Sequence, residues 1–198
     1  MKQHRIGIWN VAFYICIAAA LMFHAVFKNK DLVFSAVVTV ALVAALDLIC
    51  KNNRHIPRMI YRSAIIFVFF SMFLGKLCQF YSLVPHWDKY LHLASGILLV
   101  PAGYALYMRL GGGTQHTGLA LLFCLFFAIA CAGLWEIYEF TVDSLLHLHS
   151  QNGSLTDTMG DIIMGTLGGL LSAGVLWVHL SKRKLRFFIT IETESVKK

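Results

Sequence analysis

The sequence predicts an all-α, polytopic membrane protein with about six transmembrane helices, and two observations carry this prediction. Hydrophobic residues make up 58% of the 198 residues and charged residues only 14%, whereas a soluble domain carries about 25% charged residues. A chain this short has too little polar surface to cover so much apolar material in water. Apolar runs also recur at the length that spans a hydrocarbon core. A soluble globular fold is therefore excluded.

Six apolar segments have the length of a transmembrane helix. We expect them at residues 7–27, 32–50, 60–83, 88–108, 117–142 and 157–180. The connections between them are short and carry turn residues such as Pro57, Gly112 and Gly153. Because no connection is long enough to separate two domains, residues 1–198 are predicted to form a single transmembrane helical-bundle domain. Residues 181–198 are predicted to be its cytoplasmic basic tail.

The basic residues predict the orientation of the chain. The 17 Lys and Arg exceed the 10 Asp and Glu and give a formal net charge of +7. They lie in short clusters between apolar runs and do not alternate with exposed aromatic residues, which argues against nucleic acid as a partner. Lys and Arg are retained on the cytoplasmic side of a membrane. A chain with both termini in the cytoplasm places 13 of the 17 there: Lys2, Arg5, Lys51, Arg54, Arg58, Arg62, Arg109, Lys182, Arg183, Lys184, Arg186, Lys197 and Lys198.

Acidic residues gather at one level of the predicted bundle, in or at the ends of its last three segments. They are Asp88, Glu136, Glu139, Asp143, Asp157 and Asp161. With both termini in the cytoplasm, all six fall in the outer third of the membrane. Asp88 and His92 share a helix face because they are four residues apart, and the same spacing joins Asp157 to Asp161.

Small residues continue each polar face toward the cytoplasm. Gly96 follows His92 by four residues, and Gly165 and Gly169 follow Asp161 at the same interval. Small residues at this spacing let membrane helices approach closely. Since ionisable groups in membrane helices normally face the bundle interior, we expect one outward-opening polar pocket between the last three helices.

This pocket needs a compensating positive charge. Six carboxylates with Lys89 as the one nearby basic side chain cannot all stay ionised in a low-dielectric site. A divalent metal ion is one solution, because carboxylates and imidazole are suitable ligands. Its predicted ligands are Asp88, His92, Glu136, Glu139 and Asp161, with Asp143 and Asp157 at the rim of the ligand-binding site. Protonation of some acids is the other solution.

Helix capping is the structural alternative for single members of this set. Asp88 could cap its own helix, Asp157 could neutralise a helix N-terminus, and Ser154 or Thr156 could cap the last helix. Glu136 and Glu139 lie inside a helix, where capping is impossible.

Three functions remain open from the residues alone. The first is an integral membrane protein whose outward-facing acidic and histidine-containing site binds a divalent cation, or a proton together with a small solute. The second is a membrane-embedded, metal-dependent hydrolase or transferase acting on a lipid-linked envelope substrate, with one acid as general base to a metal-bound water. The third is a structural or accessory subunit. No known catalytic motif assigns catalytic residues. The partners are the lipid bilayer and, in the first two cases, a ligand from the outer side.

Three motifs carry a family resemblance. Trp87-Asp88-Lys89-x-x-His92, Trp135-Glu136-x-x-Glu139 and Asp157-Thr158-x-x-Asp161 resemble, in this order, the YjdF-like family of small bacterial inner-membrane proteins. Asp88-Lys89-x-x-His92 and Asp161 with Gly165-Thr166-Leu167-Gly168 are more distantly similar to VanZ-like membrane proteins, which are linked to glycopeptide antibiotic tolerance. The VanZ-like pattern usually has Asn where this chain has Gly165. The resemblance implies a multi-pass protein of the bacterial inner membrane that is connected to cell-envelope chemistry.

Overall fold

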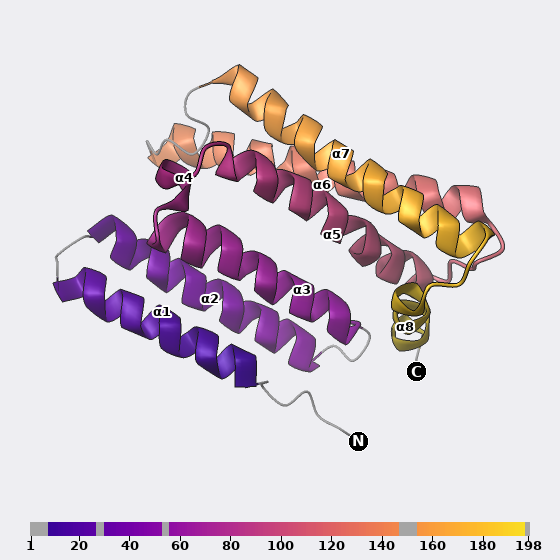
Figure 1. Cartoon of the computed structure of the whole chain (residues 1–198), viewed down its shortest axis with the longest axis horizontal. Coiled ribbons are helices and arrows are strands. Elements are labelled where there is room, and N and C mark those ends of the chain that lie inside the picture. Colours follow the sequence, from indigo (N-terminus) through magenta and orange to yellow (C-terminus); the bar gives the residue numbers. More distant parts are fainter. Residues whose placement is uncertain (1–7, 27–29, 53–55, 147–153, 197–198) are drawn as a thin grey trace. The chain divides into compact units, whose positions relative to one another are not determined.

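The computed structural model describes residues 8–26, 30–52, 56–146 and 154–196, and every regular element in these ranges is a helix (Figure 1). The predicted all-α fold is confirmed. The chain divides into two compact units, Met1–Trp87 and Asp88–Lys198, which are described separately.

The described residues of the first unit form five helical elements. These are α1 (Ile8–Val26), α2 (Lys30–Asn52), α3 (Arg58–Val68), the π-helix η1 (Phe69–Leu77) and the short α4 (Phe80–Leu83). Their apolar core is formed by Phe13, Ile17, Ala36, Val43, Ile65 and Leu77. Tyr14 and Tyr61 pack against this core, and their hydroxyls donate hydrogen bonds to the Asp47 carboxylate, that of Tyr14 at 2.8 Å. Asp47 thus links α2 to α1 and α3, and the two hydrogen bonds stabilise its carboxylate.

The third predicted segment, residues 60–83, ends earlier than its apolar pattern indicates. The helix passes from α3 into η1 and stops at Leu77, and Gln79 then adopts a left-handed conformation with φ of 60°. A residue with a side chain breaks a right-handed helix in this conformation. The predicted end at residue 83 is therefore wrong, because the apolar residues after Gln79 form the separate helix α4.

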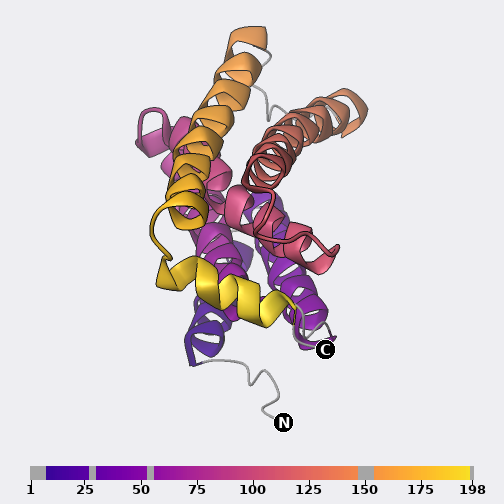
Figure 2. The same cartoon turned by 90° about the vertical axis from the view of Figure 1, so that its right-hand side faces the viewer.

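The second unit contains α5 (Trp87–Arg109), which starts one residue before the unit, α6 (Thr117–Leu146), α7 (Leu155–Ser181) and α8 (Arg186–Ser195). The first three match the predicted segments 88–108, 117–142 and 157–180. The helix α8 falls in the predicted tail, residues 181–198, and turns away from the axis of α7 after that helix ends (Figure 2).

The backbones of α5 and α7 are in direct contact in this unit. A Cβ atom added at Gly96 would overlap the carbonyl oxygen of Gly165, and one added at Gly168 would overlap the carbonyl oxygen of Leu93. The Ser172 hydroxyl also donates to the Ile97 carbonyl oxygen at 2.9 Å. The small residues of the two stripes therefore mark the helix contact, as the sequence predicted.

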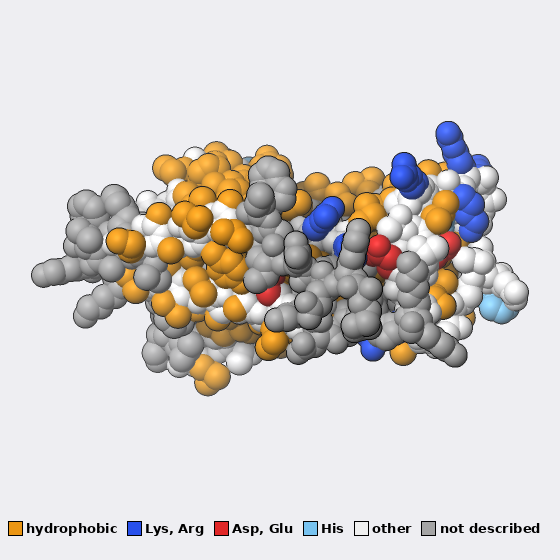
Figure 3. All heavy atoms as spheres, turned by 90° about the horizontal axis from the view of Figure 1, so that it is seen from below, with side chains coloured by type: hydrophobic (Ala, Val, Ile, Leu, Met, Phe, Trp, Pro, Cys, Tyr) orange, Lys and Arg blue, Asp and Glu red, His pale blue; other side chains and the backbone are white. Residues whose placement is uncertain are grey.

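Four helices in the described ranges are long and apolar enough to cross a membrane: Arg58–Leu77, Trp87–Arg109, Thr117–Leu145 and Leu155–Ser181. The apolar parts described for α1 and α2, Val11–Ala20 and Ser35–Cys50, are shorter. The total of six spans stays a prediction. Large apolar side chains such as Phe126, Ile137 and Phe140 are more than 60% exposed, and hydrophobic side chains cover much of the face in Figure 3. This is the surface that lipid would cover.

A polar cluster attaches α8 to α5 and α7. Glu192 Oε1 accepts a hydrogen bond from the Tyr104 hydroxyl at 2.6 Å and lies 2.9 Å from His179 Nε2. The Leu185 backbone N–H donates to His179 Nδ1 at 2.9 Å, so Nε2 carries the proton and donates to Glu192. Phe188 is buried against the rings of Tyr104 and His179.

The attachment of α8 is expected to weaken in acid. Burial alone raises the pKa of Glu192, but hydrogen bonds from Tyr104 and His179 and the charge of Lys184 outweigh burial and hold the pKa below its ordinary value of 4.5. The carboxylate therefore stabilises the folded state above that pH and loses its effect as the pH falls further. Near neutral pH, the free energy of unfolding of wild type should exceed that of Glu192→Gln by about 1 kcal/mol. Wild type should therefore unfold at a higher temperature. A difference that persists unchanged down to about pH 3 would contradict this assignment.

Candidate functional site

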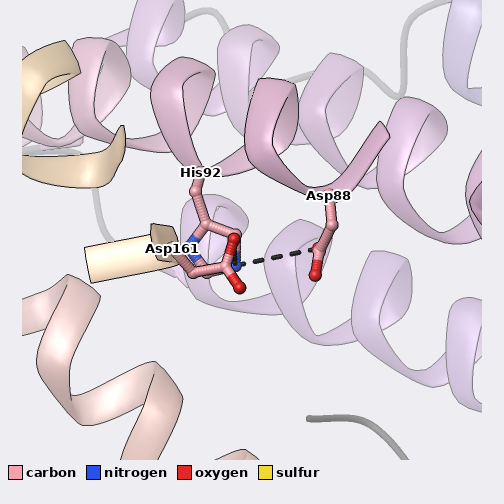
Figure 4. A group of neighbouring side chains, drawn as sticks. All are labelled: Asp88, His92 and Asp161. Carbon is pink, nitrogen blue, oxygen red and sulfur yellow. Dashed lines mark ion pairs between the residues drawn. The ribbon is translucent and has the colours of Figure 1, made fainter. Parts of the chain in front are cut away.

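The helix contact between α5 and α7 brings charged side chains together at one end of the second unit. His92 lies one turn before Gly96 on α5, and Asp161 lies one turn before Gly165 on α7. Because the glycines touch, the two side chains a turn away meet in the same space. Figure 4 shows the Asp161 carboxylate beside the His92 ring, with Asp88 one turn away on the helix that carries His92.

His92 is at the centre of three carboxylates. Its Nε2 lies 3.7 Å from Asp88 Oδ1, 3.6 Å from Glu136 Oε1 and 3.8 Å from Asp161 Oδ1. One ligand atom each from Asp88, His92 and Asp161 fall within 4.8 Å of one another. His92, Glu136 and Asp161 are 6%, 4% and 2% exposed, so water screens their charges little. Asp88, with its side chain 25% exposed, lies at the more open edge.

The distances from His92 Nε2 to the three carboxylates are longer than direct hydrogen bonds and leave room for an ion. They exceed the 2.7–3.2 Å of a good N–H···O hydrogen bond, whereas ligands of a tetrahedral ion at about 2.1 Å lie about 3.4 Å apart. Asp161 Oδ1 is buried and accepts no hydrogen bond from the described residues. An oxygen of this kind normally has a partner. A cation between His92, Asp88 and Asp161 would supply it.

Lys89 binds the other oxygen of Asp161. Its Nζ donates to Asp161 Oδ2 at 2.8 Å and to Asp157 Oδ1 at 2.7 Å. Asp157 thus lies on the Lys89 side of the cluster rather than beside His92. The start of α7 is stabilised separately, because Ser154 Oγ accepts a hydrogen bond from the Asp157 backbone N–H at 3.3 Å. The predicted Ser154 cap is confirmed.

The group of possible ion ligands contains Asp88, His92 and Asp161 and leaves out Glu136, Glu139 and Asp143. Glu139 accepts a hydrogen bond from the Trp135 indole N–H at 2.9 Å, on an exposed part of α6. Side chains three positions apart on a helix point about 60° apart around the helix axis. Glu139 therefore points in a different direction from Glu136. Asp143 is half-buried one turn later on α6. Neither residue belongs to the group around His92.

Two residues of the site had only an incomplete signal in the sequence. The sequence places Lys89 near the acids as a positive charge, but its position between Asp157 and Asp161 depends on how α5 and α7 align. Gly160 gave no signal of its own. A Cβ atom there would lie 3.1 Å from Lys89 Cε, so this glycine leaves the space that the lysine side chain fills.

Comparisons with known proteins indicate a membrane family. A family model described as "Predicted membrane protein (DUF2238)" matches residues 9–182, which include the helices of the site. A protein of Thermotoga maritima, described as "Uncharacterized protein", is 29% identical over 121 residues. The matched region covers 61% of this chain and 62% of that relative. No solved structure matches the chain significantly.

Proposed function

The chain belongs to the DUF2238 family of predicted membrane proteins, and from its site geometry we propose that it binds one divalent cation at Asp88, His92 and Asp161. One observation carries this proposal. A buried imidazole nitrogen lies 3.7 and 3.8 Å from these two carboxylates, and the Asp161 oxygen that faces it accepts no hydrogen bond from the described residues. Glu136 adds a further negative charge beside the same nitrogen.

The charge of the cluster also favours a cation. Four carboxylates, those of Asp88, Glu136, Asp157 and Asp161, lie within one or two contacts of His92, and the Lys89 ammonium contacts two of them, Asp157 and Asp161. A protonated His92 would still leave more negative than positive charges. Buried charges that are not compensated cost several kcal/mol each. With His92 neutral, as a metal ligand must be, Lys89 leaves an excess of three negative charges, and a divalent ion would reduce this excess to one without protonating the acids.

An enzyme is the second candidate, and the number of ligands supports it. Three protein ligands leave an open position on an ion, as in catalytic zinc sites, where water or substrate occupies it. Glu136 lies close enough to act as general base to such a water. The substrate would then be a lipid-linked envelope compound that reaches the site from the outer leaflet of the bacterial inner membrane.

Ion-dependent thermal stabilisation tests the proposed function. An ion that binds the folded state raises its stability by about 2.7 kcal/mol at a concentration 100 times its Kd. Chelator-treated full-length protein in detergent should therefore unfold at higher temperature with at least one of Mg²⁺, Ca²⁺, Mn²⁺ and Zn²⁺. His92→Ala should lose this response, whereas His116→Ala, which changes an exposed histidine between α5 and α6, should keep it. A flat wild-type response to all four ions would contradict ion binding and favour proton coupling or a structural cluster.

The proposed outward-facing site also requires a defined topology. In a variant without its native cysteines, a cysteine at Asn152 should react with a membrane-impermeant reagent in intact cells. This position lies outside the described residues. A cysteine at the exposed Lys184 should react only after the membrane is broken, because basic segments are retained in the cytoplasm. The reverse labelling pattern would place the site on the cytoplasmic side.

A further inference from the structure

Lys89 is packed into the same carboxylate cluster as the proposed ion. Its Nζ donates to Asp161 Oδ2 at 2.8 Å, to Asp157 Oδ1 at 2.7 Å and to the Asp157 carbonyl oxygen at 2.9 Å. Gly160 makes room for it, because a Cβ atom at this position would lie 3.2 Å from Nζ. Three acceptors and one glycine thus fix the ammonium against the first turns of α7.

Asp161 is shared between the ammonium and the proposed ion. Lys89 binds Oδ2, while Oδ1 faces His92 Nε2 at 3.8 Å. An ion bound to Oδ1 would share the Asp161 carboxylate with the Lys89 ammonium. Asp161 is 2% exposed, so water screens the repulsion between these two positive charges weakly.

We propose that Lys89 is a built-in competing cation that keeps ion binding at this site weak and reversible, an inference that rests on the proposed ion binding at Asp88, His92 and Asp161. The ammonium neutralises part of the cluster and so stabilises the ion-free form. The same charge repels the ion and lowers its affinity. Weak and reversible ion binding suits a carrier or a sensor, whereas a permanent structural metal site needs no competing positive charge.

Equilibrium dialysis of the full-length protein in detergent against Mn²⁺, and separately against Zn²⁺, tests this role. Lys89→Gln and Lys89→Met remove the charge, so both should bind the ion at least about tenfold more tightly than wild type. Lys89→Arg keeps the charge and should bind close to wild type. In chelator, the two neutral variants should unfold at lower temperature, because Asp157 and Asp161 lose their counter-ion. A purely structural lysine would show this lower stability without tighter ion binding.

The possible outcomes separate this inference from the proposed function. Equal or weaker ion binding by folded neutral variants overturns the inference and leaves ion binding by wild type intact. Misfolding of both neutral variants while Lys89→Arg folds overturns it as well, since the charge then serves folding. Binding by the neutral variants alone would mean that Lys89 prevents ion binding in wild type, which overturns the proposed function and the inference of weak, reversible binding. No ion binding by wild type or any variant removes the proposed function and the inference with it.

Discussion

Replacement of Gly96 by alanine is expected to separate α5 from α7 and to destabilise the protein by about 3 kcal/mol or more, the upper end of the cost of overpacking. The added Cβ atom would overlap the Gly165 carbonyl and come within 2.8 Å of the Gly169 backbone nitrogen. Both obstacles are backbone atoms of a neighbouring helix, so no change of side-chain rotamer relieves them. Thermal unfolding in detergent measures the loss directly.

A matched substitution separates this effect from helix propensity. Gly174 lies on α7, and a Cβ atom added there meets nothing within 4 Å. Alanine normally stabilises a helix relative to glycine by about 0.5–1 kcal/mol. Gly174→Ala should therefore leave the unfolding temperature unchanged or raise it. Equal unfolding temperatures for Gly96→Ala and Gly174→Ala would mean that α5 and α7 are not in contact at Gly96 and Gly165.

The local sequence pattern predicted the features that depend on one helix at a time. Hydropathy and length placed α5, α6 and α7 within a few residues of their observed ends, because lipid-facing helices need long apolar runs. The four-residue spacing placed Asp88 and His92 on one face, and Gly165 and Gly169 on another. The helix contact follows from such stripes, since small residues permit backbone contact.

Features that depend on two helices, or on the backbone itself, could not be predicted in this way. The end of the third segment depends on η1 and on the left-handed Gln79, and no apolar pattern marks either. The position of Lys89 against Asp157 and Asp161 depends on the register between α5 and α7. The short helix α8 has too few apolar residues for a membrane span, and its place depends on Glu192 meeting Tyr104 and His179.

Glu136 and Glu139 show the limit of spacing within a single helix. Both were predicted as ion ligands because they lie at the membrane level of the other acids, inside a helix. In the structure, Glu136 lies 3.6 Å from His92 Nε2, whereas Glu139 accepts a hydrogen bond from Trp135. A difference of about 60° around the helix axis is enough to give two neighbouring acids different surroundings. They are therefore a natural pair for testing the site.

Glu136→Gln is expected to weaken ion binding by about 10- to 100-fold, the range seen when a group that supports a metal site is removed. Glutamine keeps the shape of the side chain and removes its negative charge. The loss of one charge from a buried acidic cluster relieves repulsion, so the unfolding temperature without ion should stay the same or rise. Equilibrium dialysis against Mn²⁺ or Zn²⁺ and thermal unfolding in chelator measure the two effects separately.

Glu139→Gln is the control, because it makes the same chemical change on the same helix. Ion binding should stay close to that of wild type, since the Glu139 carboxylate contacts Trp135 and lies outside the group formed by Asp88, His92 and Asp161. Equal losses of binding in Glu136→Gln and Glu139→Gln would show that the ion senses only the total charge of α6. If Glu136→Gln instead unfolds the protein while its folded fraction still binds the ion, Glu136 stabilises the fold and has no part in the site.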